Sequence, residues 1–405
     1  MQVKNKKRSC RALSTSIVYG PNAAGKTSLL GALEVLKAIV LEGNIRDKER
    51  LTLNSSVNHM HLIPNIRPFL KNSNERKPVT LGVEAVTDEF VFSYEISFTC
   101  ENLIDEHIPR EIVFEKLTID HMPIFSRSGR SVRMEHEVPK KYRNTSAQIK
   151  GLDTLAFRNE PDELFLTGNF KAFFSSSIVQ KIREWFSEKL VILYNAQNLS
   201  AVPDVNKVPQ KAYFGLVNDV AKAFGSQANK LLYVKNQQSG EMELCSEFRT
   251  QDGRNVTIPS SLYESLGTQR LTSLFPIIAN AFLQGAALLV DELDDSIHPM
   301  AIMSLINVFH NDELNKNRGQ LIFNTHNPIY LNKSLFRTDE IKFVNRDDET
   351  HYSELYSLSD FGTKGDSRAK NTSNYMVNYF INRYGAIRNV DFSDIFSKIL
   401  EENRK

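Results

Sequence analysis

The chain has 405 residues, of which 41% are hydrophobic and 24% charged, and its 50 basic and 48 acidic residues give a formal net charge of +2. This composition is that of a globular protein with a sizeable hydrophobic core, and it excludes a disordered or collagen-like chain. The near-neutral total neither requires nor excludes nucleic acid as a partner.

The cysteines and the hydropathy of the chain limit the cellular compartments in which we expect the protein. Cys10, Cys100 and Cys245 lie far apart without a C-x-x-C spacing, which favours a reducing compartment over a disulfide or zinc framework. No apolar run approaches the roughly 18 residues that a membrane span needs. We interpret the basic residues between positions 4 and 11 as a solvated terminus, with the phosphates of DNA or RNA as the alternative contact. We therefore expect a cytoplasmic protein without a membrane partner.

The first predicted elements are a short strand over residues 13–19 and a helix over residues 28–40, whose apolar side chains recur at helical spacing. Only 19 residues precede Gly20, and they begin with a basic stretch that we expect to be poor in strands. Residues 41–75 are polar and irregular.

The middle of the chain is predicted to be rich in strands. Apolar and polar residues alternate over 79–86, 90–98, 112–119 and 132–138, which is typical of antiparallel strands with one face toward water. Helical spacing follows over 178–190 and 213–224, and further strand-like runs occupy 190–194, 230–234 and 242–248.

From residue 265 the pattern becomes α/β. A helix over 270–283 ends at Gly285, a continuous apolar run over 286–290 predicts a buried parallel strand, and Pro299 begins a helix that extends to about residue 309. Another buried strand begins at 321–323.

Residues 20–27 fit G-x-x-x-x-G-K-[ST], a phosphate-binding loop, and they lie between a predicted strand and a predicted helix. Backbone N–H groups and the helix dipole at such a position attract phosphates. We expect Lys26 to reach the β- and γ-phosphates and the Thr27 hydroxyl to bind Mg²⁺. The predicted nucleotide ligands here are Gly20, Pro21, Asn22, Ala23, Ala24, Gly25, Lys26, Thr27 and Ser28.

Two more strands end in residues suited to phosphate chemistry. Asp291 and Glu292 follow the strand over 286–290, where the carboxyl end of a parallel strand faces the ligand crevice. Asp291 suits Mg²⁺, and Glu292 suits a general base that orients and deprotonates the attacking water. His326 follows the strand at 321–323, and its imidazole can bridge phosphate and water.

The segment Ser265-Leu266-Gly267-Thr268-Gln269 begins the helix before the carboxylate strand. Small residues at a helix start form an anion site, and since the chain already has one phosphate loop, this second site would serve the nucleotide of another subunit. The alternative interpretation is a plain N-cap at Ser265. Predicted ligands here are Ser265, Gly267, Thr268 and Gln269.

The ordered set GPNAAGKT, SLGTQR, LLVDELDDSIHP and LIFNTH resembles the ABC-type ATPase head of the SMC/RecF/OLD branch. It is most similar to the stand-alone RloA-like and AriA-like ATPases of bacterial phage-defence loci. The resemblance implies that Asp291 is the Walker B aspartate, that Glu292 is the catalytic base and that His326 is the switch histidine. It also implies that Asp295, Ser296 and His298 form the loop that crosses a dimer interface. Leu266 stands where transporters have the serine of LSGGQ.

The expected fold is an α/β P-loop NTPase, an ABC-type ATPase head with an antiparallel β-rich lobe and a helical insertion between phosphate loop and signature. We divide the chain into the phosphate-loop part of the core (1–45), the β-rich lobe and mixed or helical insertion (46–260), the signature, Walker B and switch-histidine part (261–345), and a C-terminal segment packing on the core (346–405).

The expected function is that of an ATP- and Mg²⁺-dependent switch. Two heads would sandwich two ATP molecules in a homodimer or higher oligomer, with coupling to a separately encoded effector such as a nuclease in antiviral defence. The main alternative is a DNA-repair ATPase that grips DNA directly, although no heptad arms are present. A module that binds ATP without hydrolysis disagrees with the intact Lys26, Asp291, Glu292 and His326, and a GTPase disagrees with the absence of an N-K-x-D motif.

Overall fold

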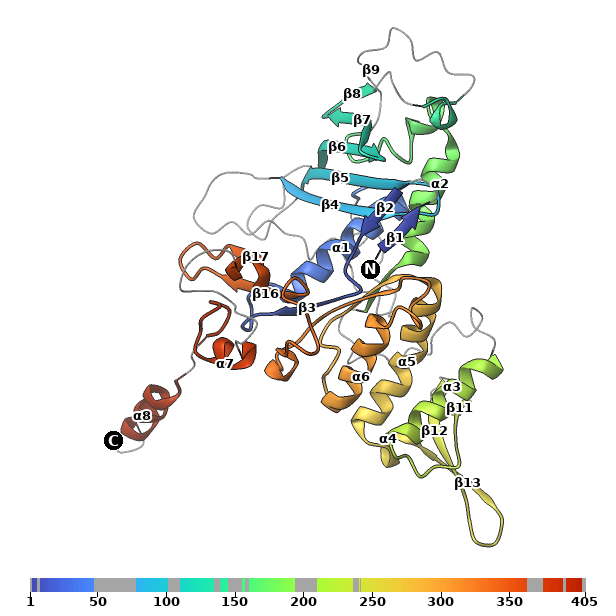
Figure 1. Ribbon diagram of the computed structural model, residues 1–405, viewed down its shortest axis with the longest axis vertical. Helices are drawn as coiled ribbons and strands as arrows, with labels where there is room; N and C mark the ends of the chain where they lie inside the picture. Colours follow the sequence, from blue (N-terminus) through green and yellow to red (C-terminus); the bar gives the residue numbers. More distant parts are fainter. Residues whose placement is uncertain are drawn as a thin grey trace. The chain divides into compact units, whose positions relative to one another are not determined.

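A computed structural model of the chain divides into two compact units (Figure 1), the first made of Met1–Ser16 with Thr27–Asn324 and the second of Ile17–Lys26 with Thr325–Lys405. The chain passes between them inside a strand, inside the phosphate loop and after Asn324. The structure describes residues 2–5, 8–46, 78–100, 110–134, 139–144, 155–156, 160–193, 210–235, 240, 242–362, 374–388 and 391–402.

A parallel sheet lies in the first unit. Its strands follow the order β10 (Leu190–Leu193), β14 (Ala287–Val290) and β15 (Gln320–Asn324). Leu288, Leu289 and Val290 are buried, as expected for a parallel strand covered on both faces. The predictions of strands near 190–194, 286–290 and 321–323 are confirmed.

Two helices flank β14 in the sequence, α5 (Leu266–Gln284) and α6 (Pro299–His310). Gly285 ends α5 with φ = 63°, and a Cβ there would lie 2.0 Å from the carbonyl oxygen of Asn317, so only glycine fits. Pro299 occupies the first turn of α6, as predicted.

The strand before the phosphate loop is β3 (Thr15–Tyr19), and all its residues are buried. Within the second unit its last residues pair in parallel with β16 (Ile341–Arg346), which pairs antiparallel with β17 (Ser353–Ser357). Rings from β16, β17 and the C-terminal segment pack together: Phe343 stacks on Tyr379 and on Tyr384. The helices here are α7 (Tyr375–Phe380) and α8 (Ser393–Glu402).

The β-rich lobe belongs to the first unit, and its strands are antiparallel and follow one another in sequence order (Figure 1). They are β4 (Val79–Val86), β5 (Val91–Thr99), β6 (Glu111–Ile119), β7 (Met122–Ser128), β8 (Ser131–Met134) and β9 (Leu155–Ala156). The four runs predicted from residue 79 are thus strands, except that 135–138 lie outside the described residues; β7 was not predicted. Buried side chains of α1 (Lys26–Glu42) and α2 (Ser176–Glu184) share one core with this sheet.

A buried carboxylate ties this sheet to the chain that follows it. Glu115, fully buried on β6, accepts hydrogen bonds from the backbone N–H groups of Phe165 (2.8 Å) and Leu166 (2.9 Å) and from the Tyr94 hydroxyl (3.0 Å). The Arg127 guanidinium lies 3.7 Å away and donates to the Glu163 carbonyl at 2.5 Å. Such a network is stable only because each buried polar group has a partner.

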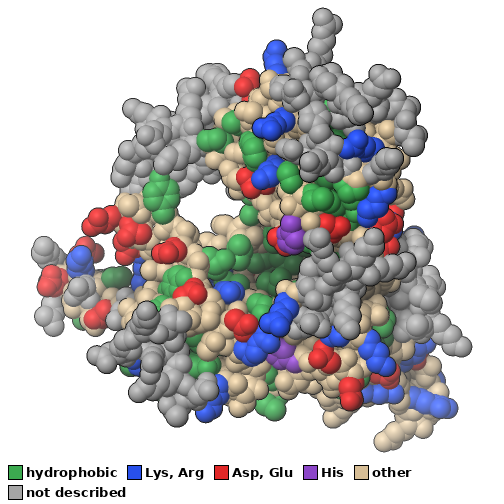
Figure 2. Space-filling view, turned by 45° about the horizontal axis from the view of Figure 1, so that its top comes forward, with side chains coloured by type: hydrophobic (Ala, Val, Ile, Leu, Met, Phe, Trp, Pro, Cys, Tyr) green, Lys and Arg blue, Asp and Glu red, His purple; other side chains and the backbone are tan. Residues whose placement is uncertain are grey.

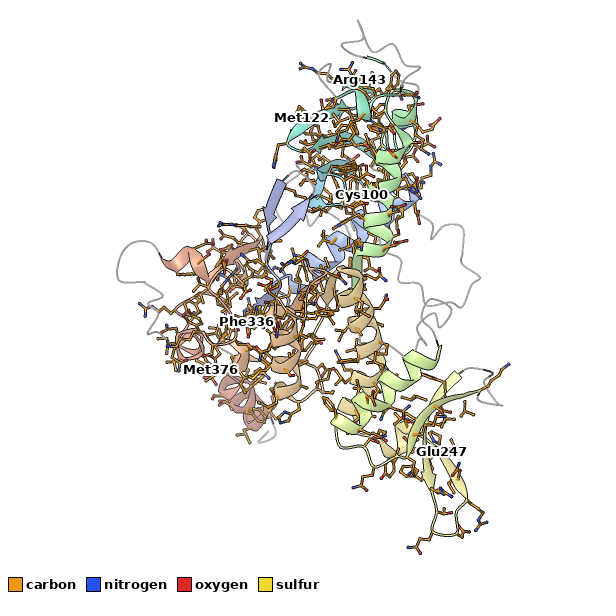
Figure 3. All side chains as sticks on the ribbon, turned by 45° about the vertical axis from the view of Figure 1, so that its right-hand side comes forward. Cys100, Met122, Arg143, Glu247, Phe336 and Met376 are labelled. Carbon is orange, nitrogen blue, oxygen red and sulfur yellow. The ribbon has the colours of Figure 1, made fainter. Side chains whose placement is uncertain are left out.

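A smaller antiparallel sheet precedes α5. Its strands are β11 (Lys230–Lys235), β12 (Met242–Arg249) and β13 (Asn255–Pro259), with helices α3 (Gln210–Ala223) and α4 (Ser260–Tyr263) beside them. Figure 3 labels Glu247 on β12. The helix and two of the strands were predicted; β13 was not.

The expectation that the basic start is poor in strands is wrong. β1 (Gln2–Asn5) and β2 (Arg8–Arg11) form an antiparallel hairpin. Their residue types have weak strand propensity, and pairing between neighbouring backbones overrides that preference. Of the region expected to be irregular (41–75), residues 47–75 lie outside the described residues.

The remaining turns are short. They are the 3₁₀ segments Lys140–Tyr142, Asn169–Ala172, Pro328–Tyr330 and Leu358–Gly362, and a π-helical turn, Trp185–Lys189, at the end of α2. Cys100 (Figure 3) and Cys245 are both buried. Among the described helices, none combines the length and the hydropathy that crossing a bilayer requires.

Candidate functional site

Residues 20–26 of the phosphate loop lie in the second unit, and their conformation depends on two glycines. A Cβ at Gly20 would lie 2.4 Å from the Val344 carbonyl oxygen, so the loop leaves β3 against the backbone of β16. Gly25 has φ = 104°, and a Cβ there would lie 3.1 Å from Ser353 Oγ. Ala23 takes φ = 62°, a left-handed conformation that costs energy outside glycine. The loop is therefore a strained turn held by the β16–β17 hairpin.

Lys26 folds back over this loop. Its side chain is buried, and Nζ donates hydrogen bonds to the carbonyl oxygens of Gly20 (3.0 Å) and Pro21 (3.1 Å). An ammonium group at the mouth of a turn with left-handed residues suits an anion at that place. Arg346 braces the same turn, since its Nη1 donates to the Ala23 carbonyl oxygen at 3.2 Å.

Thr27, the next residue, lies in the first unit, beside the carboxyl end of β14. Its Oγ1 donates to Asp291 Oδ1 at 3.1 Å, and Asp291 is almost fully buried at the end of β14. A hydroxyl and a carboxylate side by side are the hard oxygen ligands that Mg²⁺ prefers, and this ion usually keeps waters and phosphate oxygens as its other ligands. The donor set therefore fits Mg²⁺ bound together with a nucleotide. No cluster of three or more His, Cys, Asp or Glu side chains among the described residues forms a metal site without a nucleotide.

Asn324 links the Asp291 carboxylate to the backbone of Glu292, and no sequence motif assigned it a role. Its Nδ2 donates to Asp291 Oδ1, and its Oδ1 accepts from the Glu292 backbone N–H at 2.6 Å. Asn324 is fully buried at the carboxyl end of β15. Its position, directly after a buried strand that neighbours β14, was the signal available in the sequence.

Glu292 adopts a strained backbone conformation. Its φ is 48°, a left-handed value that a glutamate rarely takes. The Arg270 guanidinium of α5 donates to the Glu292 carbonyl oxygen at 2.5 Å and forms an ion pair with Asp295 Oδ2 at 2.6 Å. No role was predicted for Arg270 from the sequence either, although this residue directly follows the SLGTQ segment. Strain that surrounding contacts maintain is typical of functional residues.

The SLGTQ segment begins α5 and contacts the loop after Glu292. Ser265 is the N-cap, and its Oγ accepts from the Thr268 backbone N–H at 3.1 Å. A Cβ at Gly267 would lie 2.4 Å from the Ser296 carbonyl oxygen. Gln269 Nε2 donates to the Glu264 carbonyl oxygen at 2.8 Å. Ser265 thus acts as a plain N-cap of α5 in this structure. The nucleotide contacts expected of this segment stay predictions.

Glu264 in turn connects the helix start with the small sheet. Its carboxylate accepts from Ser226 Oγ at 2.7 Å and from Ser246 Oγ at 3.1 Å, and the residue is 9% exposed. The small sheet therefore supports the SLGTQ segment through one buried carboxylate.

The other predicted residues occupy separate places. Ser296 has φ = 60° and is exposed, and His298 is the N-cap of α6, with Nδ1 accepting from the Met300 backbone N–H at 3.2 Å. His326 is an exposed residue of the second unit. The structure brings together Thr27, Asp291, Glu292, Asn324, Arg270 and Asp295 in the first unit; Gly20 to Lys26 and His326 belong to the second.

A family model covering residues 16–332 matches the chain, and the family is described as "AAA domain, putative AbiEii toxin, Type IV TA system". The chain belongs to this family. The AAA-domain match spans both the phosphate loop and the residues from Ser265 to His326. No curated protein matches the chain.

Solved structures similar to this AAA-domain protein include the SMC head domain from Thermotoga maritima, with a TM-score of 0.37 and 14% identity, covering 85% of this chain and 89% of that one. Another is an Smc head domain with an extended coiled coil bound to the C-terminal domain of ScpA derived from Pyrococcus furiosus, with a TM-score of 0.34 and 14% identity, covering 85% of this chain and 89% of that one.

Membership of an AAA-domain family, together with the P-loop motif, makes this chain a P-loop protein of the ATPase class. In this AAA-domain protein a lysine lies over the loop, a hydroxyl lies beside a buried aspartate, and a glutamate directly follows that aspartate.

Proposed function

We propose that this protein is an ATP-hydrolysing ABC-type ATPase that acts as a nucleotide-driven switch. The observation that carries the proposal is the hydrogen-bond chain Thr27–Asp291–Asn324–Glu292, which ties the end of the phosphate loop to the Asp291 carboxylate and to the backbone N–H of Glu292. Four residues from three separate parts of the sequence meet there through their polar groups.

Each residue has a role that follows from its place. Gly20 to Ser28 and the Lys26 ammonium bind phosphates. Thr27 and Asp291 hold Mg²⁺, which neutralises phosphate charge when it is bound. Glu292 orients a water and takes its proton as the bond between water oxygen and γ-phosphorus forms and the bond to the ADP oxygen breaks. Asn324 fixes the position of Asp291 relative to the Glu292 backbone. His326 contacts the γ-phosphate.

A second copy of the chain completes the site in this proposal. Ser265, Gly267, Thr268, Gln269 and Asp295 of one copy face the ATP of the other, so that ATP joins the copies and hydrolysis separates them. Support comes from the start of α5, where Leu266 is 72% exposed and a helix N-terminus faces outward with its N-cap exposed.

The cellular role proposed is antiphage defence with a separately encoded effector such as a nuclease. Support comes from the family description, which names a toxin of a type IV toxin–antitoxin system. Phage challenge of bacteria that express the chain with its neighbouring genes tests this role. Protection should be lost with Lys26→Ala and with Glu292→Gln; protection retained by both variants would contradict it.

The test of the chemistry is ATP turnover. We expect Glu292→Gln to lower kcat by roughly 10²–10⁴-fold while ATP still binds, because the amide cannot take a proton. Glu313→Gln is the matched control, an exposed glutamate in the loop after α6. If the Glu292→Gln variant hydrolysed ATP at the wild-type rate, Glu292 would not be the general base.

Direct DNA binding, as in a repair ATPase, is the competing function. On the face that Figure 2 shows, Lys and Arg side chains are interspersed with Asp and Glu, and the described residues form no continuous basic stripe there. A DNA shift assay across salt concentrations, with and without ATP, separates the two functions, since phosphate contacts give a steep salt dependence. A steep, ATP-dependent shift would favour the repair function.

A further inference from the structure

A cavity of about 670 Å³ lies beside the phosphate loop, entirely within the second unit. Residues 21–23 of the loop contribute to its wall, together with residues 345 and 346 at the end of β16 and residues 347–349 and 351 of the turn before β17. The C-terminal segment contributes Gly385, Ile387 and Arg388. This volume is in the range of small-molecule sites.

The shape of this cavity is fixed by hydrogen bonds. Asp347 Oδ1 accepts from the backbone N–H groups of Glu349 (3.1 Å) and Thr350 (2.6 Å), and these bonds together with that of the Thr350 hydroxyl hold the pKa of Asp347 below its ordinary value. Asp348 is ion-paired with Arg388, which joins the hairpin turn to the C-terminal segment. The wall is therefore built before any ligand arrives.

The chemistry of the lining differs from that of the loop. Asp348 and Glu349 are exposed carboxylates at the cavity, which repel phosphate and accept hydrogen bonds from hydroxyl groups. Ile387 is a half-buried apolar side chain suited to a flat ring, and the half-buried His351 lines the same space. Arg346 connects the two regions, because it lines the cavity and donates to the Ala23 carbonyl oxygen of the loop.

We propose that this cavity binds the nucleoside end of the triphosphate held by the phosphate loop. Ile387 packs against the base, and the carboxylates of Asp348 and Glu349 accept hydrogen bonds from the ribose hydroxyls. The C-terminal segment is then a specificity element of the nucleotide site. This assignment rests on the proposed ATP binding.

Inorganic tripolyphosphate separates the two proposals, because it engages only the phosphate loop. Calorimetry with the full chain carrying Glu292→Gln compares Mg²⁺ complexes of ATP, 2′,3′-dideoxy-ATP and tripolyphosphate. We expect ATP to bind at least about tenfold more tightly than tripolyphosphate. Absence of binding by both would contradict the proposed function, and equal affinity would overturn the nucleoside site alone.

Two further variants of that chain test the wall. Ile387→Ala should weaken ATP roughly tenfold and leave tripolyphosphate within about twofold, since it removes apolar contact with the base only. The double variant Asp348→Asn/Glu349→Gln should remove the preference for ATP over the dideoxy analogue. Glu354→Gln on β17, which does not line the cavity, is the control and should change neither ligand. Variants that weaken ATP and tripolyphosphate equally, or weaken neither, would overturn the proposal.

Discussion

At the scale of single residues, Arg270 contacts the backbone of Glu292, the proposed catalytic base. Two of its guanidinium nitrogens make these contacts: Nη2 donates to the Glu292 carbonyl oxygen and Nη1 pairs with Asp295, and the side chain is 9% exposed. We expect Arg270→Ala to lower kcat for ATP by at least about tenfold with KM within about twofold, because misplacement of a reacting group reduces the rate rather than the binding.

The control for Arg270 is Arg318→Ala, since Arg318 forms an ion pair with the exposed Asp312 at the surface. Steady-state kinetics of both variants checks the prediction. A rise in KM at unchanged kcat would show that Arg270 supports nucleotide binding and not the position of Glu292.

A substitution at Asn324 tests magnesium binding by a measurement that does not depend on ATPase activity. Asn324→Asp places a second buried carboxylate against Asp291, so we expect the melting temperature in EDTA to fall by roughly 4–8 °C. Added magnesium chloride should recover more stability in the variant than in the wild type, because the ion binds the folded form.

Asn315→Asp is the matched control for this metal effect. Asn315 is also buried and donates to the carbonyl oxygens of Phe309 (2.9 Å) and Gly319 (2.8 Å), so its variant should melt earlier with no added response to magnesium. Differential scanning fluorimetry of both variants measures this. An equal magnesium response in the two would contradict a site at Asp291.

At the scale of elements, the Glu115 network holds the β-rich lobe to the segment at Phe165 and Leu166. Glu115→Gln keeps the volume of the side chain but turns an amide N–H₂ group toward groups that themselves donate hydrogen bonds. We therefore expect the free energy of unfolding to fall by about 1–3 kcal/mol. Glu95→Gln, on the exposed side of β5, should cost almost nothing. Urea titration measures both.

The same group has a pH signature. Burial raises the pKa of Glu115 above its ordinary value of 4.5, although backbone N–H groups and Arg127 lower it in part. Between the ordinary and the raised pKa the folded state binds more protons than the unfolded chain, so the stability contribution of Glu115 falls as pH rises through that window. Glu115→Gln should flatten this slope; an unchanged slope would assign it to another group.

The elements show what sequence patterns can predict. Long periodic runs such as α1 and the strands β4 to β6 were predicted because their apolar residues face one core. β1, β2, β7 and β13 were missed, since pairing with a neighbour in the sheet decides such short strands more than their own residues do. In the site, the motif residues were found, whereas Asn324 and Arg270 act through contacts across more than 20 residues of chain, which no local pattern encodes.

At the scale of the whole molecule, assembly through the start of α5 is the remaining prediction. The chain with Glu292→Gln should dimerise when ATP is added, because that variant binds ATP without turnover. Adding Leu266→Asp should keep the chain monomeric while ATP binding is unchanged, since Leu266 is 72% exposed and a carboxylate there opposes both the partner surface and its phosphates. Leu283→Asp provides the matched control: Leu283 lies near the other end of the same helix and is 64% exposed. Light scattering after gel filtration measures the mass. Dimers of the Leu266→Asp chain, or loss of dimers with Leu283→Asp alone, would mean that the start of α5 is not the surface that receives the partner's nucleotide.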